Sequence, residues 1–345
     1  MSEEKLTGGF RSLGEFLVAT RKYLDGEARD SRIDELFQKT MSEGTDSAGG
    51  VLVPEKWADQ ILSVALENSI VRSRAIRIPG NSDTLNVRVL VDSDRSSNIF
   101  GGITMTWLEE AGDKAANVSD PSLGNLKLTA HEGVVGAFVS NSLENDVEKF
   151  EQFFLQAFGR AIRFYEDEAY IWGTGSGQPL GIMNSGAMIP VTRTANSKVD
   201  LADIGNMAER LLPGSWQMAV WLVNQSVLSE LMELTANAAN PASVIDLAKM
   251  QILGRPIIVT EKCSAMGTTG DIILADFGQY VIFDRELIVA SSRHVNYGGN
   301  YGFLQNETFW KIVLRVDGQP VPQGPITPRR GGSTVSPFVC LTTSS

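Results

Sequence analysis

The sequence predicts a protein of the α+β class, and three observations lead to this prediction. Residues Asp146–Trp172 have the apolar spacing of one long amphipathic helix. Residues 84–140 begin and end with alternating apolar and polar residues, the pattern of two strands joined by a long loop. Residues 185–300 mix short strand and helix patterns in an order that favours a compact sheet with helices over a doubly wound parallel fold.

The composition is typical of a soluble globular protein with two or three domains. The 345 residues contain ordinary fractions of apolar and charged residues. The formal net charge of −11 disfavours sequence-independent nucleic-acid binding, which depends on basic surface. Cys263 and Cys340 lack a CxxC spacing, which argues against a disulfide framework or structural zinc and favours a reducing cytoplasm. There is no signal-peptide pattern and no apolar run long enough to span a bilayer, so we expect no membrane association.

The first 48 residues are polar and charged, with two thin apolar stripes. Phe10, Leu13 and Phe16 share helical spacing in the first stripe, and the second lies within residues 33–37. Neither stripe is wide enough to form a core alone. Two interpretations therefore remain open: a frayed tail with two short helices, or an arm that lies on a neighbouring subunit.

Two strand patterns, at residues 84–92 and 126–140, enclose a long segment rich in Gly, Ser, Asn and Asp. A loop of this length in a compact domain is functional or marks a wrong element assignment. A long two-stranded ribbon that projects from the body accounts for both strands. Because an isolated ribbon is marginally stable in water, we expect it to rest on a partner, most simply another copy of the chain.

The long helix has clear signals at both ends. Asn145 and Asp146 supply N-cap side chains, and Gly173 begins the stop. At 1.5 Å per residue the helix would extend about 40 Å. The following GTGSGQPLGI, Gly173–Ile182, lacks the Lys-Ser/Thr of a phosphate-binding P-loop and follows a helix rather than a strand, so we interpret it as a tight exit turn.

The remaining elements are short, and each has an apolar stripe at helical spacing or an alternating or continuous apolar run. Helices are expected at Glu55–Glu67, Leu201–Leu212, Gln225–Leu234 and Ala242–Ile252. Extended segments are expected at Val71–Pro79, Met218–Val223, Pro256–Thr260, Asp271–Ala275, Tyr280–Asp284, Leu287–Ser291, Glu307–Val316 and Pro337–Thr343. A turn at Asp317–Gly318 and a loop rich in Pro, Gly and Arg at 322–334 separate the last two strands.

No catalytic site is assembled by the sequence pattern. His131 and His294 have no nucleophile at a recognisable spacing, and there is no G-x-S-x-G motif. The carboxylate pairs Glu109–Glu110 and Asp167–Glu168 are interpreted as solvated, although a carboxylate-dependent hydrolase stays an alternative. We expect no catalytic residue, no metal ligand and no cofactor.

Five passages, in this order and spacing, resemble the HK97-fold family of major capsid proteins of tailed bacteriophages. They are DSAGGVLVP at Asp46–Pro54, the strand–loop–strand with Trp107-Leu-Glu-Glu, the long helix with GTGSGQPLGI, LGRPIIVTEKC with DIILADFGQYVIFDR between Leu253 and Arg285, and ETFWKIVLRVDGQPV from Glu307. The resemblance covers roughly residues 46–345. It implies an HK97-like fold with an N-terminal arm, an extended E-loop, a peripheral domain with a long spine helix, and an axial domain.

The resemblance also implies a division of the chain. The expected parts are an N-terminal arm at 1–48, the first peripheral-domain segment at 49–83, the E-loop ribbon at 84–130, the peripheral domain with its spine helix at 131–184, the axial domain at 185–300, and the closing peripheral strands with the C-terminal segment at 301–345.

The implied function is structural and non-enzymatic. Hexamers and pentamers would tile an icosahedral or elongated shell around packaged double-stranded DNA, in a virion assembled in the bacterial host cytoplasm. Implied partners are the chain itself, a scaffolding protein, a portal and decoration proteins. Residues 1–45 are too few for the large fused scaffolding domain of some members, so the alternatives are a separate scaffolding protein and assembly directed by the arm itself. The acidic balance suits an inner wall past which DNA slides. An encapsulin-type nanocompartment shell with the same fold is the alternative.

The residues expected to make assembly contacts lie in the arm and the E-loop. They are Phe10, Leu13, Phe16, Ile103, Trp107, Glu109, Glu110 and Lys114. Some family members cross-link an E-loop lysine to an asparagine of a neighbour. Lys114 lies in a suitable loop, but no acceptor asparagine or assisting glutamate can be matched. We therefore expect no cross-linking and interpret Lys114 as a salt-bridging residue.

Overall fold

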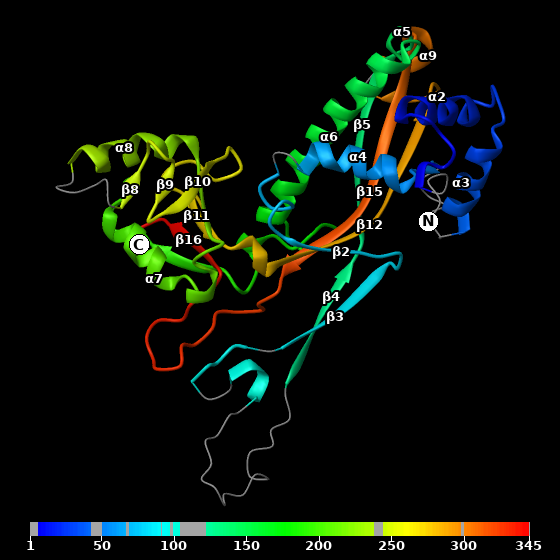
Figure 1. Cartoon of the computed structure of the whole chain (residues 1–345). Helices are drawn as coiled ribbons and strands as arrows, with labels where there is room; N and C mark the ends of the chain where they lie inside the picture. Colours follow the sequence, from blue (N-terminus) through cyan, green and yellow to red (C-terminus); the bar gives the residue numbers. More distant parts are fainter. Residues whose placement is uncertain are drawn as a thin grey trace, which may run out of the picture.

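The computed structural model describes residues 6–42, 50–66, 69–90, 92–96, 99–103, 122–237, 244–297 and 300–344 (Figure 1). It contains a five-stranded sheet, a seven-stranded sheet and a projecting two-stranded ribbon, with helices packed against both sheets. The α+β class is therefore confirmed. None of the helices in the described ranges is long and apolar enough to cross a membrane.

The five-stranded sheet forms the elongated body of the subunit. Its strands are β1 (Val51–Leu52), β2 (Ile76–Pro79), β5 (His131–Ser140), β12 (Tyr280–Ser292) and β15 (Glu307–Pro320). The order is β1-β12-β15-β5 with β2 also paired to β12; only the β2–β12 pairing is parallel. The two strands predicted between Tyr280 and Ser291 are one strand with a register shift between Asp284 and Leu287, and the predicted turn at Asp317–Gly318 lies inside β15.

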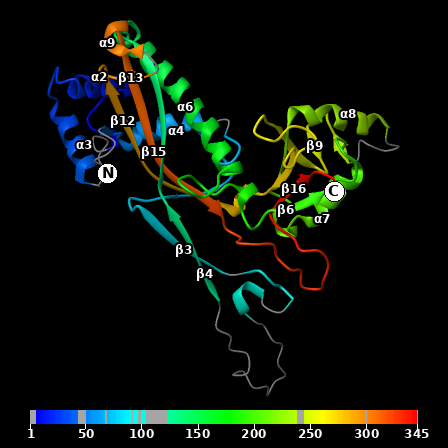
Figure 2. The same ribbon diagram turned by 180° about the vertical axis from the view of Figure 1, so that it is seen from behind.

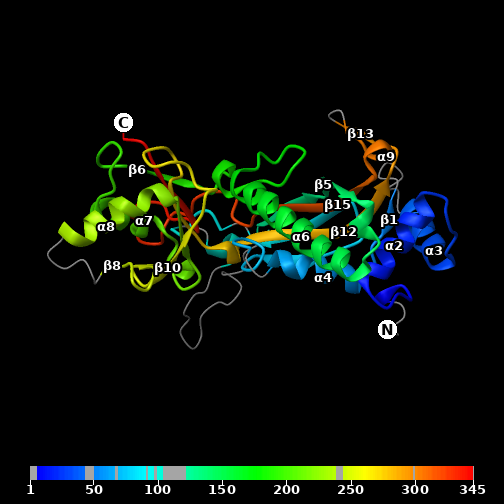
Figure 3. The ribbon, with the colours of Figure 1, turned by 90° about the horizontal axis from the view of Figure 1, so that it is seen from above.

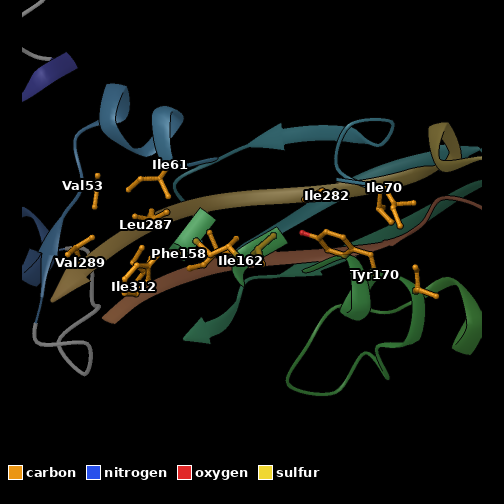
Figure 4. Close-up of a cluster of buried hydrophobic side chains, with 14 of the residues drawn as sticks. Val53, Ile61, Ile70, Phe158, Ile162, Tyr170, Ile282, Leu287, Val289 and Ile312 are labelled. Carbon is orange, nitrogen blue, oxygen red and sulfur yellow. The ribbon is translucent and has the colours of Figure 1, made fainter. Parts of the chain in front are cut away.

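The long helix α6 (Val147–Trp172) lies along one face of this sheet beside α4 (Glu55–Leu66), as Figure 3 shows from above. The Asp146 side chain accepts a hydrogen bond from the Lys149 amide and caps the helix. Phe150, Phe154 and Phe158 are buried along its inner face, and the first two contact the Trp310 ring of β15. Figure 4 shows the same core farther along, where α6 faces β12, β15 and α4. The predicted helix is confirmed, and its aromatic stripe forms the centre of the body.

The amino-terminal segment forms two helices, α2 (Leu13–Leu24) and α3 (Ser31–Ser42), that cover the end of the same body. Phe10 is only 3% exposed, and Leu13 and Phe16 are completely buried, all three within the core that contains α6. These residues are therefore neither frayed nor available to a neighbouring subunit in this structure. The thin stripes need no core of their own because they complete one supplied by the sheet and α6.

The second body is built on the seven-stranded sheet, in the order β6-β16-β11-β7-β10-β9-β8. The strands are β6 (Ile189–Thr192), β7 (Val220–Val223), β8 (Ile245–Asp246), β9 (Gln251–Ile252), β10 (Arg255–Val259), β11 (Ile272–Ala275) and β16 (Phe338–Thr342), with α7 (Leu201–Arg210) and α8 (Leu228–Asn237) beside them. Short elements elsewhere are α5 (Asn141–Glu144), α9 (Gly302–Gln305), β13 (Asn296–Tyr297) and β14 (Asn300–Tyr301).

Sheet membership differs from the expected division at two places. Strand β12, expected at the end of the axial domain, pairs with β15 in the five-stranded sheet. Strand β16, expected to close the peripheral domain, pairs with β6 and β11 in the seven-stranded sheet. The chain therefore crosses between the two bodies once more than the sequence pattern indicates.

The helix predicted at Ala242–Ile252 is wrong over its described part. Residues 245–252 instead form β8, a turn and β9, and β9 continues into β10 through Leu253 and Gly254. Leu253 and Gly254 both have positive φ, which matches the tight two-residue hairpin turn that joins twisted strands. The apolar residues that suggested a helical stripe belong to short strands.

The segment after α6 is a tight exit turn, as predicted. Gly175 and Gly177 have positive φ, and Thr174 and Leu180 form an isolated bridge across the turn. A Cβ atom on Gly173 would lie 2.1 Å from the Pro179 carbonyl oxygen, so only glycine fits there.

Candidate assembly site

The predicted ribbon is confirmed and projects away from both bodies (Figures 1 and 2). It consists of β3 (Thr84–Leu90) and β4 (Leu123–Thr129), paired antiparallel in continuous register from Thr84–Thr129 to Leu90–Leu123. One face is apolar and carries Leu85, Val87, Val89, Leu126 and Leu128. The predicted returning strand is divided at Ala130, where the chain leaves the ribbon and enters the five-stranded sheet as β5.

The end of the ribbon nearest the body, residues 84–87 paired with 126–129, is called its root, and it rests on its own subunit. Leu126 and Leu128 are 1% and 0% exposed because they pack with Val281 and Phe283 of β12. Gly80 permits this contact, since a Cβ atom there would lie 2.7 Å from the Phe283 ring. The expectation that the whole ribbon needs another copy for support is therefore corrected at the root.

Charged side chains hold the same root. Asp83, just before β3, accepts hydrogen bonds from Arg285 and from Arg315 (3.4 Å). Arg315 also forms ion pairs with Glu132 at 3.2 Å and with Glu286 at 3.3 Å. A network that shares one arginine among three carboxylates is more rigid than an isolated surface pair, whose contribution is typically only about 0–1 kcal/mol.

Asp317 of β15 adds a buried contact to the ribbon. Its carboxylate accepts hydrogen bonds from the Thr129 amide at 2.7 Å and the Gly318 amide at 2.8 Å. Burial raises the pKa of Asp317, although these two amides and His131 favour its ionised form. The residue at the predicted turn thus anchors the last residue of β4.

Apolar side chains are exposed in the described outer part of the ribbon. Leu90, Leu123 and Ile103 are 45%, 51% and 53% exposed. Of the predicted assembly residues, Ile103 lies here, whereas Phe10, Leu13 and Phe16 lie in the subunit core. Trp107, Glu109, Glu110 and Lys114 lie outside the described residues. The structure therefore places the four described candidates in two separate regions.

A second exposed apolar surface lies where α6 diverges from the edge strand β5. Val134 of β5 is 60% exposed and Tyr165 of α6 is 63% exposed. Between them is a hollow of about 340 Å³, lined also by Ile162, Ala169 and Leu314. Among the described strands, β5 pairs with β15 alone, which leaves its other edge without a described partner strand.

A buried charge cluster joins α6 to the sheet near this hollow. Arg72 donates to Glu166 of α6 through Nε at 3.0 Å and to Asp284 of β12 at 2.7 Å. Burial raises the pKa of Glu166, while the Glu166 and Asp284 carboxylates outweigh burial at Arg72 and raise the pKa of its guanidinium. The cluster connects three elements that are distant in sequence.

Asp167 corrects the interpretation of the Asp167–Glu168 pair as solvated. Its buried carboxylate accepts hydrogen bonds from the Ser69 hydroxyl and from the Ile70 and Val71 amides, at 2.9 to 3.0 Å. Asp167 therefore closes the turn before β2 and is committed to a structural role. The sequence signal for this structural role was the helical spacing, which places Asp167 at the border of the buried face of α6.

The two histidines and the two cysteines were the other candidates for chemistry. His131 begins β5, and His294 is exposed after β12. Cys263 and Cys340 are buried, and burial raises the pKa of each thiol to about 12. Within the described part of the chain, no three His, Cys, Asp or Glu side chains are grouped to hold a metal ion.

Sequence analysis missed the residues that position the ribbon. Asp83, Arg285, Arg315 and Asp317 meet only because β12 and β15 pair beside the ribbon root. The only sequence signal was the charged triplet Asp284-Arg285-Glu286, which interrupts an otherwise apolar strand. Charged residues inside an apolar strand are typical of a β-bulge, where the register shifts and side chains are redirected toward a contact.

The sequence matches the model of the phage capsid family over residues 49–329. The fold is similar to the capsid of a native GTA particle, with a TM-score of 0.55 and 16% identity over 82% of this chain and 91% of that chain. It is also similar to a chain from Mycobacterium phage Bobi (TM-score 0.53, 14% identity, 81% and 91% covered) and one from Microbacterium phage Oxtober96 (TM-score 0.53, 18% identity, 80% and 91% covered). No curated protein sequence matches the chain.

Proposed function

The chain belongs to the phage capsid family and is a major capsid protein that associates with copies of itself into the virion shell, and we propose that these copies form hexamers and pentamers of an icosahedral or elongated shell around packaged double-stranded DNA. The ribbon carries this proposal. Its root is fixed on its own subunit, yet its outer part exposes apolar side chains that no described residue covers. A closed symmetric assembly supplies an identical neighbour for every such surface.

The assembly contacts are proposed at the outer ribbon. Ile103 is exposed in this part of the chain, as are Leu90 and Leu123. Trp107, Glu109, Glu110 and Lys114 follow Ile103 in sequence, and we keep them as proposed contacts, with Lys114 in an ion pair rather than a covalent cross-link. Phe10, Leu13 and Phe16 receive a different role: their burial supports an arm that stays on its own subunit.

The domain division is proposed in a form that follows sheet pairing. The N-terminal arm at 1–48, the ribbon at 84–130 and the spine-helix segment at 131–184 keep their expected limits. The axial domain takes residues 185–279 together with β16, because these strands share the seven-stranded sheet. The peripheral domain takes β12 and β15 together with residues 49–83, because these strands share the other sheet.

The proposed partners and setting follow from the shell role. A scaffolding protein, a portal and decoration proteins would act on the assembled copies in the bacterial host cytoplasm. The net charge of −11 supports weak, non-specific proximity to packaged DNA rather than tight binding. The role is proposed to be non-enzymatic; the buried Asp167 and the thiols held protonated by burial support this.

The test is electron microscopy in negative stain, beside sedimentation, of the protein expressed alone and with its phage's scaffolding protein. Closed shells or capsomer rings are the expected result. A subunit that stays monomeric under both conditions would contradict the proposal. The contents of shells purified from infected cells separate the alternatives, because a nanocompartment would hold an enzyme and a capsid would hold DNA.

A further inference from the structure

The loop rich in Pro, Gly and Arg between β15 and β16 has a defined structure. Ile326 and Val335 exchange two backbone hydrogen bonds, of 2.8 and 2.9 Å, and form the base of a short hairpin. The exposed tip carries Arg329, Arg330 and two glycines. We call residues 322–336 the strap.

One end of the strap is attached to the seven-stranded body. The Ser336 amide donates to the Arg210 carbonyl, and the Leu212 amide donates to the Ser336 carbonyl, both at 2.9 Å. Arg210, the last residue of α7, also donates through its guanidinium to the Thr334 hydroxyl at 3.0 Å. Leu212, Ile326 and Val335 form a small buried apolar cluster beneath these bonds.

The other side of the strap holds the ribbon beyond β3. The Thr327 amide donates to the Ser93 carbonyl at 2.9 Å, and the Arg95 amide donates to the Thr327 carbonyl at 3.0 Å. This is a parallel bridge between Asp94 and Thr327. The Arg329 guanidinium approaches the Arg95 carbonyl at 3.4 Å. In Figures 1 and 2 the red strap reaches the cyan segment that carries residues 92–96.

From these contacts we propose that the strap fixes the direction of the ribbon relative to α7 and the seven-stranded sheet. The ribbon is held at two separate places: its root on β12 and β15, and its outer segment on Thr327. A ribbon bound only at its root can change its direction relative to both bodies. A ribbon bound at two places moves only together with the bodies to which it is bound. The strap therefore couples the angle of the ribbon to the position of the axial body.

The consequence for assembly rests on the proposed function. If the outer ribbon contacts a neighbouring subunit, then the strap sets the angle between neighbours, and shell curvature depends on it. Loss of the strap would leave each subunit folded, because the strap lies outside both main cores. It would widen the range of shell diameters rather than abolish association.

The experiment compares two substitutions within the strap in assembled shells. Thr327→Pro removes the amide that donates to Ser93, and the extended bridge geometry accommodates proline. Gly324→Ala is the matched control, because a Cβ atom there meets nothing within 4 Å. Hydrogen exchange measured by mass spectrometry reports on residues 92–96, and electron microscopy reports the distribution of diameters.

We expect Thr327→Pro to speed amide exchange at residues 92–96 by roughly five- to tenfold, the effect of losing about one hydrogen bond, and to broaden the shell diameters. Gly324→Ala is expected to match the unmodified protein in both measurements. Unchanged exchange at 92–96, or unchanged diameters despite faster exchange, would overturn the proposal. If the unmodified protein forms no shells, the proposed function fails, whereas normal shells from all three proteins mean that only the strap proposal fails.

Discussion

The spine-helix region and the projecting ribbon are stabilised in opposite ways. Along α6, aromatic rings pack on β15 inside one continuous core, and even the charged groups Arg72 and Glu166 are paired internally. The ribbon has one half-covered apolar face and depends on its root for burial. The difference indicates that the inner face of α6 is completed within one subunit, whereas the outer ribbon leaves apolar side chains exposed for the proposed association.

The largest expected effect comes from the aromatic stripe of α6. Phe154 is completely buried and contacts the rings of Phe150, Phe158 and Trp310. We expect Phe154→Ala to lower the free energy of unfolding by about 3–5 kcal/mol, since it removes a large buried side chain and leaves a cavity. Denaturant unfolding of soluble subunits or capsomers measures this change.

The neighbouring Phe153 provides the control for that experiment. Its side chain is 40% exposed on the same helix. Phe153→Ala should change the free energy of unfolding by less than about 1 kcal/mol, as is usual for exposed positions. Equal losses for the two variants would show that α6 is not the rigid centre of the subunit.

The second prediction separates the root of the ribbon from its outer part. Leu128→Ala removes a buried side chain from the root, and we expect it to destabilise the ribbon locally by about 2–3 kcal/mol. Leu90→Ala removes an exposed side chain and should leave subunit stability unchanged while it slows or weakens shell formation. Hydrogen exchange of β3 and β4 measures the first effect, and light scattering during assembly measures the second.

The two leucine variants also test the division between folding and association. Reduced stability in Leu90→Ala subunits before assembly would show that the outer ribbon already packs on its own subunit. Normal assembly of Leu90→Ala would remove this residue from the intersubunit contact. Either result would weaken the contrast between a complete spine region and an incomplete ribbon.

The parts of the fold predicted from sequence are those specified by local patterns. The helix α6, the pairing of β3 with β4 and the exit turn at Gly173 follow from apolar period, capping residues and glycine spacing. Sheet membership was not predicted, because β12 and β16 pair with strands far away in sequence. No local pattern records which of two sheets a strand joins.

The ribbon anchors illustrate the same limit at the candidate site. Asp83 and Asp317 each lie in polar, turn-like sequence and give no sign that they meet the ribbon root from opposite ends of the chain. Ile103 was expected at an assembly contact because it lies in the segment that resembles the E-loop, whose apolar groups should be exposed in an isolated subunit, and it is 53% exposed. Contacts made through tertiary structure were missed, whereas the exposure of Ile103 agrees with an intersubunit contact that stays a prediction.

The smallest expected effect concerns the pH dependence of the ribbon root. Burial raises the pKa of Asp317, so the folded state holds this proton more tightly than the unfolded state. The stabilisation from the protonated group is complete below the ordinary pKa of an aspartate and is lost as pH rises through the higher folded value.

Asp317→Asn keeps an oxygen that accepts from the Thr129 amide but cannot ionise. We expect its free energy of unfolding, relative to the unmodified protein, to increase as pH rises above the ordinary pKa of an aspartate, about 4. Denaturant titrations at several pH values measure this difference, and Asp83→Asn tests whether the dependence comes from the buried anchor or from the exposed ion pairs. A relative free energy that falls with rising pH would mean that the two amides outweigh burial at Asp317, and the ribbon root would then be held by a stabilised carboxylate.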